Sequence, residues 1–249
     1  MSSPPTPSGP GALKALLFDK DGTLIDFDRT WGPAAYEVMT TLAGGDRARL
    51  ERLMLVSEYV EEERRFLPTS PLIAGSSAHY GPLWAGALGR EPGEALYREM
   101  DDLFRLGGLR HLAPIGAPAA ILRELAGRGL HLGIATNDAE ASARAQAEAL
   151  GLCDLVGFVA GYDSGFGGKP DPGMVTAFVE RHGLAPSEVA LIGDSKHDLL
   201  AARAAGVRAV AVLTGPLRDA ARPEIEPHAD HVLGSISDLP AWLDGELDG

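Results

Sequence analysis

The chain contains 249 residues, of which 45% are hydrophobic and 23% are charged, and its formal net charge is -13. This composition is ordinary for a globular protein of one or two domains and argues against a disordered or fibrous chain. The acidic balance leaves no basic stripe for nucleic acid or for an anionic membrane surface. We therefore expect a small molecule as the binding partner, with no role for nucleic acid or membrane.

Two features of the sequence predict its compartment. A single cysteine, Cys153, allows no disulfide within the chain, which is typical of a reducing cytosol. The opening residues MSSPPTPSGP lack the cationic and apolar regions of a signal peptide, and no apolar run approaches the roughly 18 residues that span a bilayer. We expect a cytoplasmic monomer or homodimer with a disordered arm at residues 1–11.

Five short apolar runs predict strands, in chain order at residues 12–18, 130–136, 155–160, 189–194 and 207–213. Four of them are nearly continuous, as in parallel strands that are buried on both faces. Helical patterns fill the connections at residues 117–127, 138–150, 172–182 and 197–205. Strands that alternate with helices predict an α/β fold with a doubly wound, Rossmann-like parallel sheet.

Residues 24–113 break this alternation and predict a helical cap inserted after the first strand. Apolar residues line one face of a predicted helix over 46–66, and the insertion shows no strand pattern. Turn-forming residues at 111–118 mark the return to the sheet. The predicted α/β core therefore comprises residues 12–23 and 114–249.

Polar side chains follow three of the predicted strands. Asp19 and Asp21 come after the first strand, Thr136 and Asn137 end the second, and Asp194 follows the fourth. Doubly wound sheets bind their ligands outside the carboxyl ends of the strands. We therefore expect these five side chains to share one site.

Four aspartates form two pairs at two of these strand ends. Side chains two apart on an extended segment point the same way, so Asp19 and Asp21 of DKDGT can face one site. Asp194 and Asp198 belong to GDSKHD; the alternative is that the aspartates cap a turn, or that Asp198 complements a helix N-terminus. Together the four supply the oxygen ligands that Mg²⁺ prefers, and we predict Mg²⁺ as the cofactor.

A cation for a substrate phosphate is predicted at Lys169, in GFGGKPDP before a helix start that favours anions. The alternative is a lysine on the surface; a P-loop is ruled out because Asp163 and Pro170 occupy two of its essential positions. Thr136 and Asn137 would recognise phosphate oxygens beside a carboxylate nucleophile. Protonation of Asp21 would relieve the crowding of carboxylates and make it a usable acid.

The cap offers three candidates for contact with a substrate carboxylate, namely Arg64, Arg65 and His79. A guanidinium group suits a carboxylate, and Arg64 is therefore predicted as a substrate-binding residue. The alternative for each is a solvated helix face.

DKDGT at 19–23, TN at 136–137, KP at 169–170 and GDSKHD at 193–198 resemble the four ordered motifs of the haloacid dehalogenase-like hydrolase superfamily. The resemblance extends over residues 12 to about 240 and is closest to phosphoglycolate phosphatase-like members with a helical cap. Relatives often have an apolar residue where this chain has Lys20. We expect Lys20 to interact with the cap or to reach solvent, without consequence for the chemistry.

The resemblance implies a role for each motif. Asp19 would be the nucleophile that forms an aspartyl-phosphate, and Asp21 the acid and then the base. Mg²⁺ would be held by Asp19, the backbone carbonyl of Asp21 and Asp194, with Asp198 in the outer shell. Thr136 and Lys169 would hold the phosphoryl oxygens.

The expected activity is Mg²⁺-dependent hydrolysis of a small phosphomonoester, with phosphoglycolate as the leading candidate by resemblance. Three alternatives are a phosphosugar mutase of the β-phosphoglucomutase type, a haloacid dehalogenase and a non-catalytic phosphate-binding regulator. Asp21 and Asp194 count against the dehalogenase, which should lack the second aspartate and the metal. The complete set of four motifs counts against the regulator.

Overall fold

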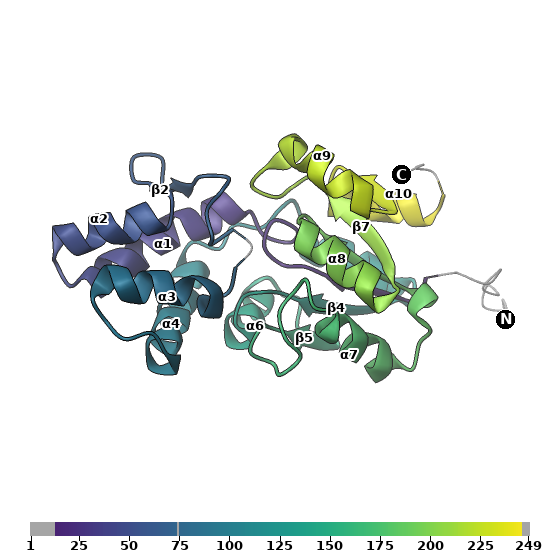
Figure 1. Ribbon diagram of the computed structural model, residues 1–249. Coiled ribbons are helices and arrows are strands. Elements are labelled where there is room, and N and C mark those ends of the chain that lie inside the picture. The colour runs from purple at the N-terminus through teal and green to yellow at the C-terminus, as the bar shows by residue number, and fades with distance from the viewer. Residues whose placement is uncertain (1–12, 74, 246–249) are drawn as a thin grey trace, which may run out of the picture.

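The structure is a computed structural model that describes residues 13–73 and 75–245. It has two parts, one made almost entirely of helices and one built on a sheet with helices on both sides (Figure 1). The predicted arm at residues 1–11 lies outside the described residues. Among the residues described, no helix is long and apolar enough to cross a bilayer.

The sheet has six strands, β1 (Ala15–Phe18), β4 (His131–Ala135), β5 (Phe158–Ala160), β6 (Val189–Gly193), β7 (Arg208–Val212) and β8 (His231–Leu233). All neighbours are parallel, in the order β5-β4-β1-β6-β7-β8. This confirms the predicted α/β class and the five predicted strands. The sixth strand, β8, is not predicted because three residues, two of them only half-buried, are too few to show a period.

The register of the central strand brings three strand ends to the same level. Phe18, the last residue of β1, pairs with Ile134 of β4 on one side and with Ile192 of β6 on the other. The residues that follow these three positions therefore meet at one edge of the sheet, as expected for parallel strands.

Helices cover both faces of the sheet because alternate side chains of β1 point to opposite sides. On one face, Leu16 and Phe18 pack in an apolar cluster with α5 (Pro118–Gly127), α6 (Glu140–Ala149) and α10 (Leu239–Leu243). On the other, Ala15 and Leu17 pack with α7 (Gly173–His182), α8 (Lys196–Ala205) and α9 (Arg222–Ile225). The four predicted core helices are confirmed to within one or two residues at each end. Short 3₁₀ turns occupy Pro186–Glu188, Arg218–Ala221, Glu226–His228 and Ile236–Asp238.

We call residues 24–113 the cap. Its described residues, all but residue 74, form four helices: α1 (Phe27–Ala43), α2 (Arg47–Val56), α3 (Ser77–Leu88) and α4 (Glu94–Arg110). Their apolar faces form a cluster of their own, with Trp84 and Met100 fully buried. Asp26 and Asp46 cap α1 and α2 by accepting hydrogen bonds from the backbone N–H groups of Arg29 and Arg49.

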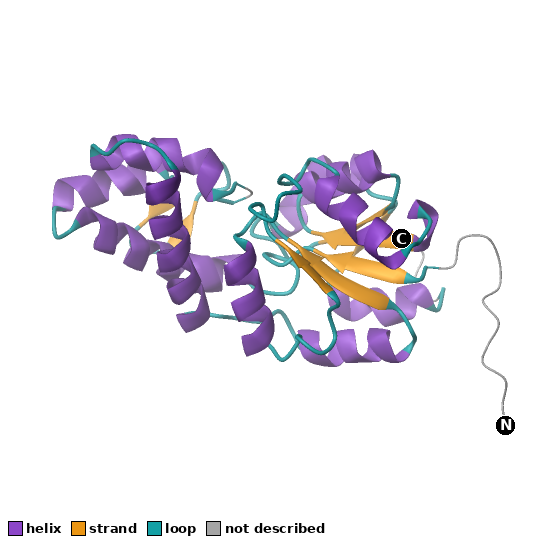
Figure 2. Ribbon diagram, turned by 90° about the horizontal axis from the view of Figure 1, so that it is seen from below, coloured by secondary structure: helices purple, strands orange, loops and turns teal. Residues whose placement is uncertain are grey.

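The prediction of a helix over 46–66 and of no strands in the cap is wrong. The helix α2 ends at Val56, and an antiparallel hairpin follows, made of β2 (Tyr59–Val60) and β3 (Arg65–Phe66). Figure 2 shows this small pair of strands among the cap helices. Two-residue strands around a charged turn leave no alternating pattern in the sequence, which explains the error.

Two adjacent segments join the cap to the sheet. Asp26 N–H donates to the Ala113 carbonyl at 2.8 Å, and Ile115 N–H donates to the Leu24 carbonyl at 3.0 Å. The two crossings are therefore bonded to each other. That residues 24–113 form a separate folding unit stays a prediction.

Candidate active site

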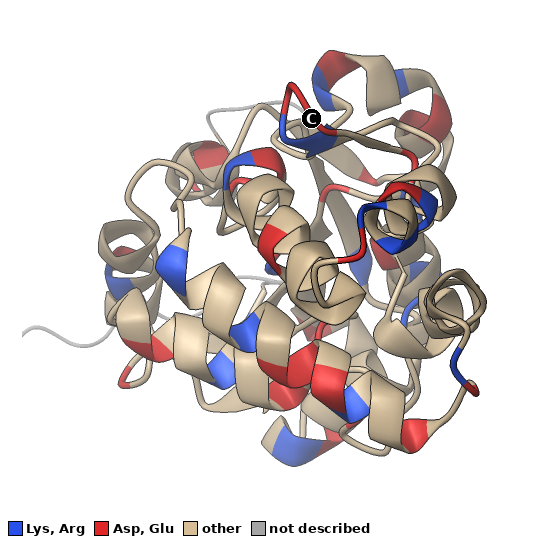
Figure 3. Ribbon diagram, turned by 90° about the vertical axis from the view of Figure 1, so that its left-hand side faces the viewer, with Lys and Arg blue, Asp and Glu red and all other residues tan. Residues whose placement is uncertain are grey.

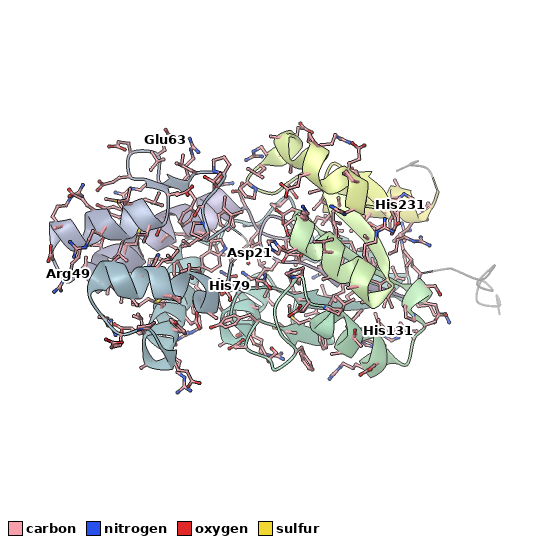
Figure 4. The ribbon with its side chains drawn as sticks, viewed as in Figure 1. Asp21, Arg49, Glu63, His79, His131 and His231 are labelled. Carbon is pink, nitrogen blue, oxygen red and sulfur yellow. The ribbon has the colours of Figure 1, made fainter. Side chains whose placement is uncertain are left out.

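The chain leaves β1 in a tight turn that presents two aspartates. Gly22 adopts a φ of 84°, and a Cβ there would lie 2.6 Å from the carboxylate of Asp194, so only glycine fits this turn. The Thr214 hydroxyl donates to the Gly22 carbonyl at 2.6 Å and holds the turn. Asp19 is buried, and Asp21 lies where the cap meets the sheet (Figure 4).

Three carboxylates gather beside this turn. One oxygen each of Asp19, Asp194 and Asp198 lies within 4.8 Å of the other two. Glycines make the room, because a Cβ on Gly215 would lie 1.9 Å from Asp194 and one on Gly193 would lie 2.3 Å from Asp198. This set of oxygen donors fits a hard divalent cation.

Burial and crowding act on the protonation of these carboxylates. Burial raises the pKa of Asp19 to about 7, although the ammonium of Lys169 opposes this shift. Burial, followed by the charges of Asp19 and Asp198, raises the pKa of Asp194. A bound cation would stabilise the ionised carboxylates, since opposite charge favours the charged form.

The predicted cation, Lys169, lies inside this cluster and is 3% exposed. Its Nζ is 2.5 Å from Asp19 and 2.6 Å from Asp198, and it donates to the Ala135 carbonyl at 2.8 Å. Burial alone would lower the pKa of this ammonium, but the two carboxylates raise it above its ordinary value. Lys169 is therefore a fixed positive charge beside Asp19.

Asn137 fixes the loop that carries this lysine. Its Oδ1 accepts from the Lys169 backbone N–H at 2.8 Å, and its Nδ2 donates to the Lys169 carbonyl at 2.9 Å. This pairing joins the end of β4 to the glycine-rich loop. The structure thus gives Asn137 a positioning task, in addition to its place on the wall of the cavity.

Three donors face the carboxylate of Asp21. The Lys20 ammonium donates at 2.8 Å and the Thr136 hydroxyl at 3.2 Å, and the indole N–H of Trp31 in α1 donates from the cap. Asp21 is therefore held by the strand end of β4 and by the cap together. This arrangement fixes the direction in which its carboxylate points.

Of the two expectations for Lys20, contact with the cap is confirmed, and exposure to solvent is wrong. Lys20 is 1% exposed, and its Nζ also lies 2.6 Å from Gln146 and 3.0 Å from Asp138. The ammonium sits 4.8 Å from the ring centre of Trp31. Burial opposes the charge on Lys20, but Asp21 and Asp138 raise its pKa above the ordinary value.

A cavity opens above these residues, between the sheet edge and the cap. The core contributes Asp19, Asp21, Thr136, Lys169 and Asp194 to its wall, among others. The cap contributes five aromatic rings, from Phe27, Trp31, Phe66, Tyr80 and Phe104. A molecule in this cavity would contact charged groups on one side and rings on the other.

None of the three cap residues predicted to meet a substrate carboxylate is among the described residues that line the cavity. The ring of His79 lies 2.9 Å from the Ser76 hydroxyl. The guanidinium of Arg64 stacks on the ring of Tyr36, 3.3 Å from its centre, and Arg64 is not among the described residues that line the cavity. Arg65 pairs with Glu63, and Glu63 lies on the outer rim of the cap (Figure 4). Charges of both signs cover the outside of the cap (Figure 3). This placement does not support substrate binding by Arg64.

Sequence reasoning missed several polar residues of the site, namely Trp31, Asp101, Asp138, Gln146 and Tyr162. Asp138 could have been predicted as a site residue, because it directly follows Thr136 and Asn137 at the end of a strand. The others act through contacts between distant segments, such as the one that joins Lys20 to Gln146.

The fold and the site define a class of enzyme, a hydrolase with a carboxylate cluster at the edge of a doubly wound sheet. The family model for haloacid dehalogenase-like hydrolases matches residues 13–206, and the chain belongs to this family.

The phosphoglycolate phosphatase of Rhodospirillum rubrum is 34% identical over 239 residues, covering 92% of this chain and 90% of that protein. The phosphoglycolate phosphatase of Thiobacillus denitrificans is 29% identical, with 93% and 96% covered. These relatives confirm the predicted family and the predicted class of enzyme, a phosphatase.

Solved structures share the fold. CbbY from Rhodobacter sphaeroides in complex with phosphate superposes with a TM-score of 0.65 at 20% identity, covering 93% of this chain and 99% of that chain. A predicted phosphoglycolate phosphatase from Haemophilus somnus gives a TM-score of 0.70 at 18% identity, covering 94% and 99%. At these identities the likeness concerns the fold alone.

Proposed function

We propose that the protein is a Mg²⁺-dependent phosphomonoester hydrolase that works through an aspartyl-phosphate on Asp19. The observation that carries this proposal is the pairing of Asp19 with a buried ammonium, Lys169, at 2.5 Å, beside two further carboxylates. A carboxylate nucleophile needs such a cation nearby, because the phosphoryl group that it attacks is itself negative.

The first half of the reaction is transfer of the phosphoryl group to Asp19. A carboxylate oxygen of Asp19 bonds to phosphorus as the bond between phosphorus and the alcohol oxygen breaks. Asp21 gives a proton to that oxygen, and the alcohol leaves. Thr136 and Lys169 hold the phosphoryl oxygens, and Asn137 keeps Lys169 in place.

The second half is hydrolysis of the intermediate. A water oxygen bonds to phosphorus while Asp21 accepts a proton from it, and the bond from phosphorus to Asp19 breaks. Inorganic phosphate leaves, and both aspartates return to their starting states. The donors around Asp21, Lys20 and Trp31 among them, keep its carboxylate aimed for both proton transfers.

The metal would be held by Asp19, the backbone carbonyl of Asp21 and Asp194. Asp198 suits the outer shell, because it is already paired with Lys169 and accepts from the Ser195 hydroxyl at 2.6 Å. Mg²⁺ would neutralise charge that develops on the phosphoryl oxygens. The glycines at 22, 193 and 215, which make room for the carboxylates, support this assignment.

The names of the relatives make phosphoglycolate the leading candidate for the substrate. Its second anionic group, a carboxylate, would have to bind on the cap side of the cavity. Phosphoglycolate therefore requires a binding site for a carboxylate on the cap, whereas the hydrolytic chemistry itself does not.

Phosphate release from p-nitrophenyl phosphate, with Mg²⁺ and after chelation, tests the proposed reaction. In Asp19→Asn protein we expect a loss of kcat of at least about 10,000-fold, because the covalent step is lost. Asp154→Asn, a change of the same kind at an exposed position, should keep full activity. Substantial turnover by Asp19→Asn protein, or full turnover of the wild type without a divalent cation, would contradict the proposal.

A further inference from the structure

The cap side of the cavity has a chemical character of its own. Five aromatic rings line it, and the ring centres of Trp31 and Phe104 lie 5.9 Å apart while those of Tyr80 and Phe104 lie 6.3 Å apart. Of the described cap residues on this wall, none is a lysine or an arginine, and one is a carboxylate, Asp101.

Asp101 is held in place from two directions. It lies on α4 and accepts hydrogen bonds from the Ser77 hydroxyl of α3 and, at 2.7 Å, from the Tyr162 hydroxyl of the core. Tyr162 follows β5, so this contact joins the cap to the sheet. The carboxylate is thereby fixed on the cavity wall that the rings of Tyr80 and Phe104 also line.

Electrostatics decide which substrates this wall suits. The described residues that line the cavity include five aspartates and one lysine, Lys169, which the phosphoryl group would occupy; the aspartates are Asp19, Asp21, Asp101, Asp138 and Asp194. The ammonium group of Lys20 is already paired with the carboxylates of Asp21 and Asp138, and Lys20 is not among the described residues that line the cavity. A second anionic group on the substrate would meet the rings, the polar residues Ser76 and Ser77 and the carboxylate of Asp101, with no lysine or arginine from the described part of the cap.

Two interactions would favour a cationic group of the substrate on the cap side of the cavity. Ring faces attract an ammonium group through their quadrupole, and this attraction strengthens when the group is desolvated. A partly buried carboxylate adds a charge-assisted hydrogen bond. Aromatic rings with one carboxylate therefore supply the acceptors that an ammonium group prefers.

We propose that the preferred substrates are phosphomonoesters of small amino alcohols, with the phosphate beside Asp19 and Lys169 and the ammonium group beside Asp101 and the aromatic rings. This inference rests on the proposed Mg²⁺-dependent hydrolysis through Asp19, and it concerns the leaving group of the ester. It replaces phosphoglycolate, the candidate suggested by the names of the relatives, because the carboxylate of phosphoglycolate would occupy the place of the ammonium group.

A series of three esters of similar size tests it with the wild-type enzyme and Mg²⁺. The esters are 2-aminoethyl phosphate, propyl phosphate and phosphoglycolate, which carry an ammonium, a methyl and a carboxylate group. We expect kcat/KM for 2-aminoethyl phosphate to exceed that for propyl phosphate by at least about tenfold, the size of a hydrogen bond between charged groups. Phosphoglycolate should be the poorest. A phosphoglycolate value equal to or above that of 2-aminoethyl phosphate would overturn the inference.

The variant Asp101→Asn tests whether Asp101 causes the preference for an ammonium group. The ratio of kcat/KM between 2-aminoethyl phosphate and propyl phosphate should fall by about tenfold, toward unity. Asp102→Asn, an exposed neighbour, should keep the wild-type ratio. An unchanged ratio in Asp101→Asn protein would overturn the assignment.

The two proposals fail in different ways. If p-nitrophenyl phosphate and propyl phosphate are both inert in the presence of Mg²⁺, the proposed hydrolase is wrong. If propyl phosphate is hydrolysed in a manner that depends on Asp19 but the ammonium group gives no advantage, only the inference about the substrate is wrong. The wild-type series decides this even if Asp101→Asn protein does not fold.

Discussion

The two walls of the cavity are built by different means. The core wall consists of charged and polar side chains placed by the level ends of β1, β4 and β6. The cap wall includes five aromatic rings, placed by helix packing and by the hairpin β2–β3, together with the carboxylate of Asp101. The first wall fixes atoms for a reaction, and the second offers a surface for a leaving group. The proposed chemistry and the proposed choice of substrate therefore depend on different parts of the chain.

The residue Lys20 joins the two walls, and its removal should have the largest effect. Lys20→Met leaves Asp138 and Asp21 without their buried ammonium, and we expect the free energy of unfolding to fall by about 3–5 kcal/mol. Urea denaturation measures this loss. The double variant Lys20→Met with Asp138→Asn should recover part of the stability, since one uncompensated charge is gone. A loss below about 1 kcal/mol in the single variant would show that Lys20 is not a buried partner of these carboxylates.

On the core wall alone, Lys169→Met should lower kcat for p-nitrophenyl phosphate by about 100-fold to 1000-fold, because the fixed positive charge beside Asp19 is lost. Steady-state kinetics with Mg²⁺ measures the change. Lys196→Met, at a half-exposed side chain that pairs loosely with Glu224, is the matched control and should be nearly silent. Equal kcat values for the two variants would show that Lys169 takes no part in the reaction.

The smallest effect is expected where the cap reaches into the chemistry. Trp31→Phe keeps a ring on the cap wall but removes the N–H that donates to Asp21, so kcat should fall by about tenfold for every ester. Trp242→Phe, on the far helix α10, should leave kcat unchanged. If the loss in Trp31→Phe protein depends on the ester used, this residue acts on the leaving group instead of on Asp21.

The same division explains how much could be predicted from the sequence. Asp19, Thr136 and Asp194 are recognisable because parallel register brings strand ends together whatever the helices do. Lys169 is recognisable from its loop, and the structure brings it to Asp19 as expected.

The cap resisted prediction because its contacts join distant segments. Arg64 looked suited to a substrate carboxylate, yet the hairpin turn directs it onto Tyr36. For Lys20 the sequence left contact with the cap and exposure to solvent both open, and α6 and α1 enclose it through Gln146 and Trp31. Neither outcome follows from local periodicity, since both depend on which helix packs beside the strand end.

The covalent intermediate is the central claim of this account, and it can be measured directly. Asp21→Asn protein, which lacks the base for the second step, is mixed with p-nitrophenyl phosphate and Mg²⁺, quenched in acid and digested for mass spectrometry. The account predicts one phosphoryl group on Asp19, in a peptide that remains unmodified in the Asp19→Asn variant. A phosphoryl group on another residue, or none while phosphate is still released, would contradict it.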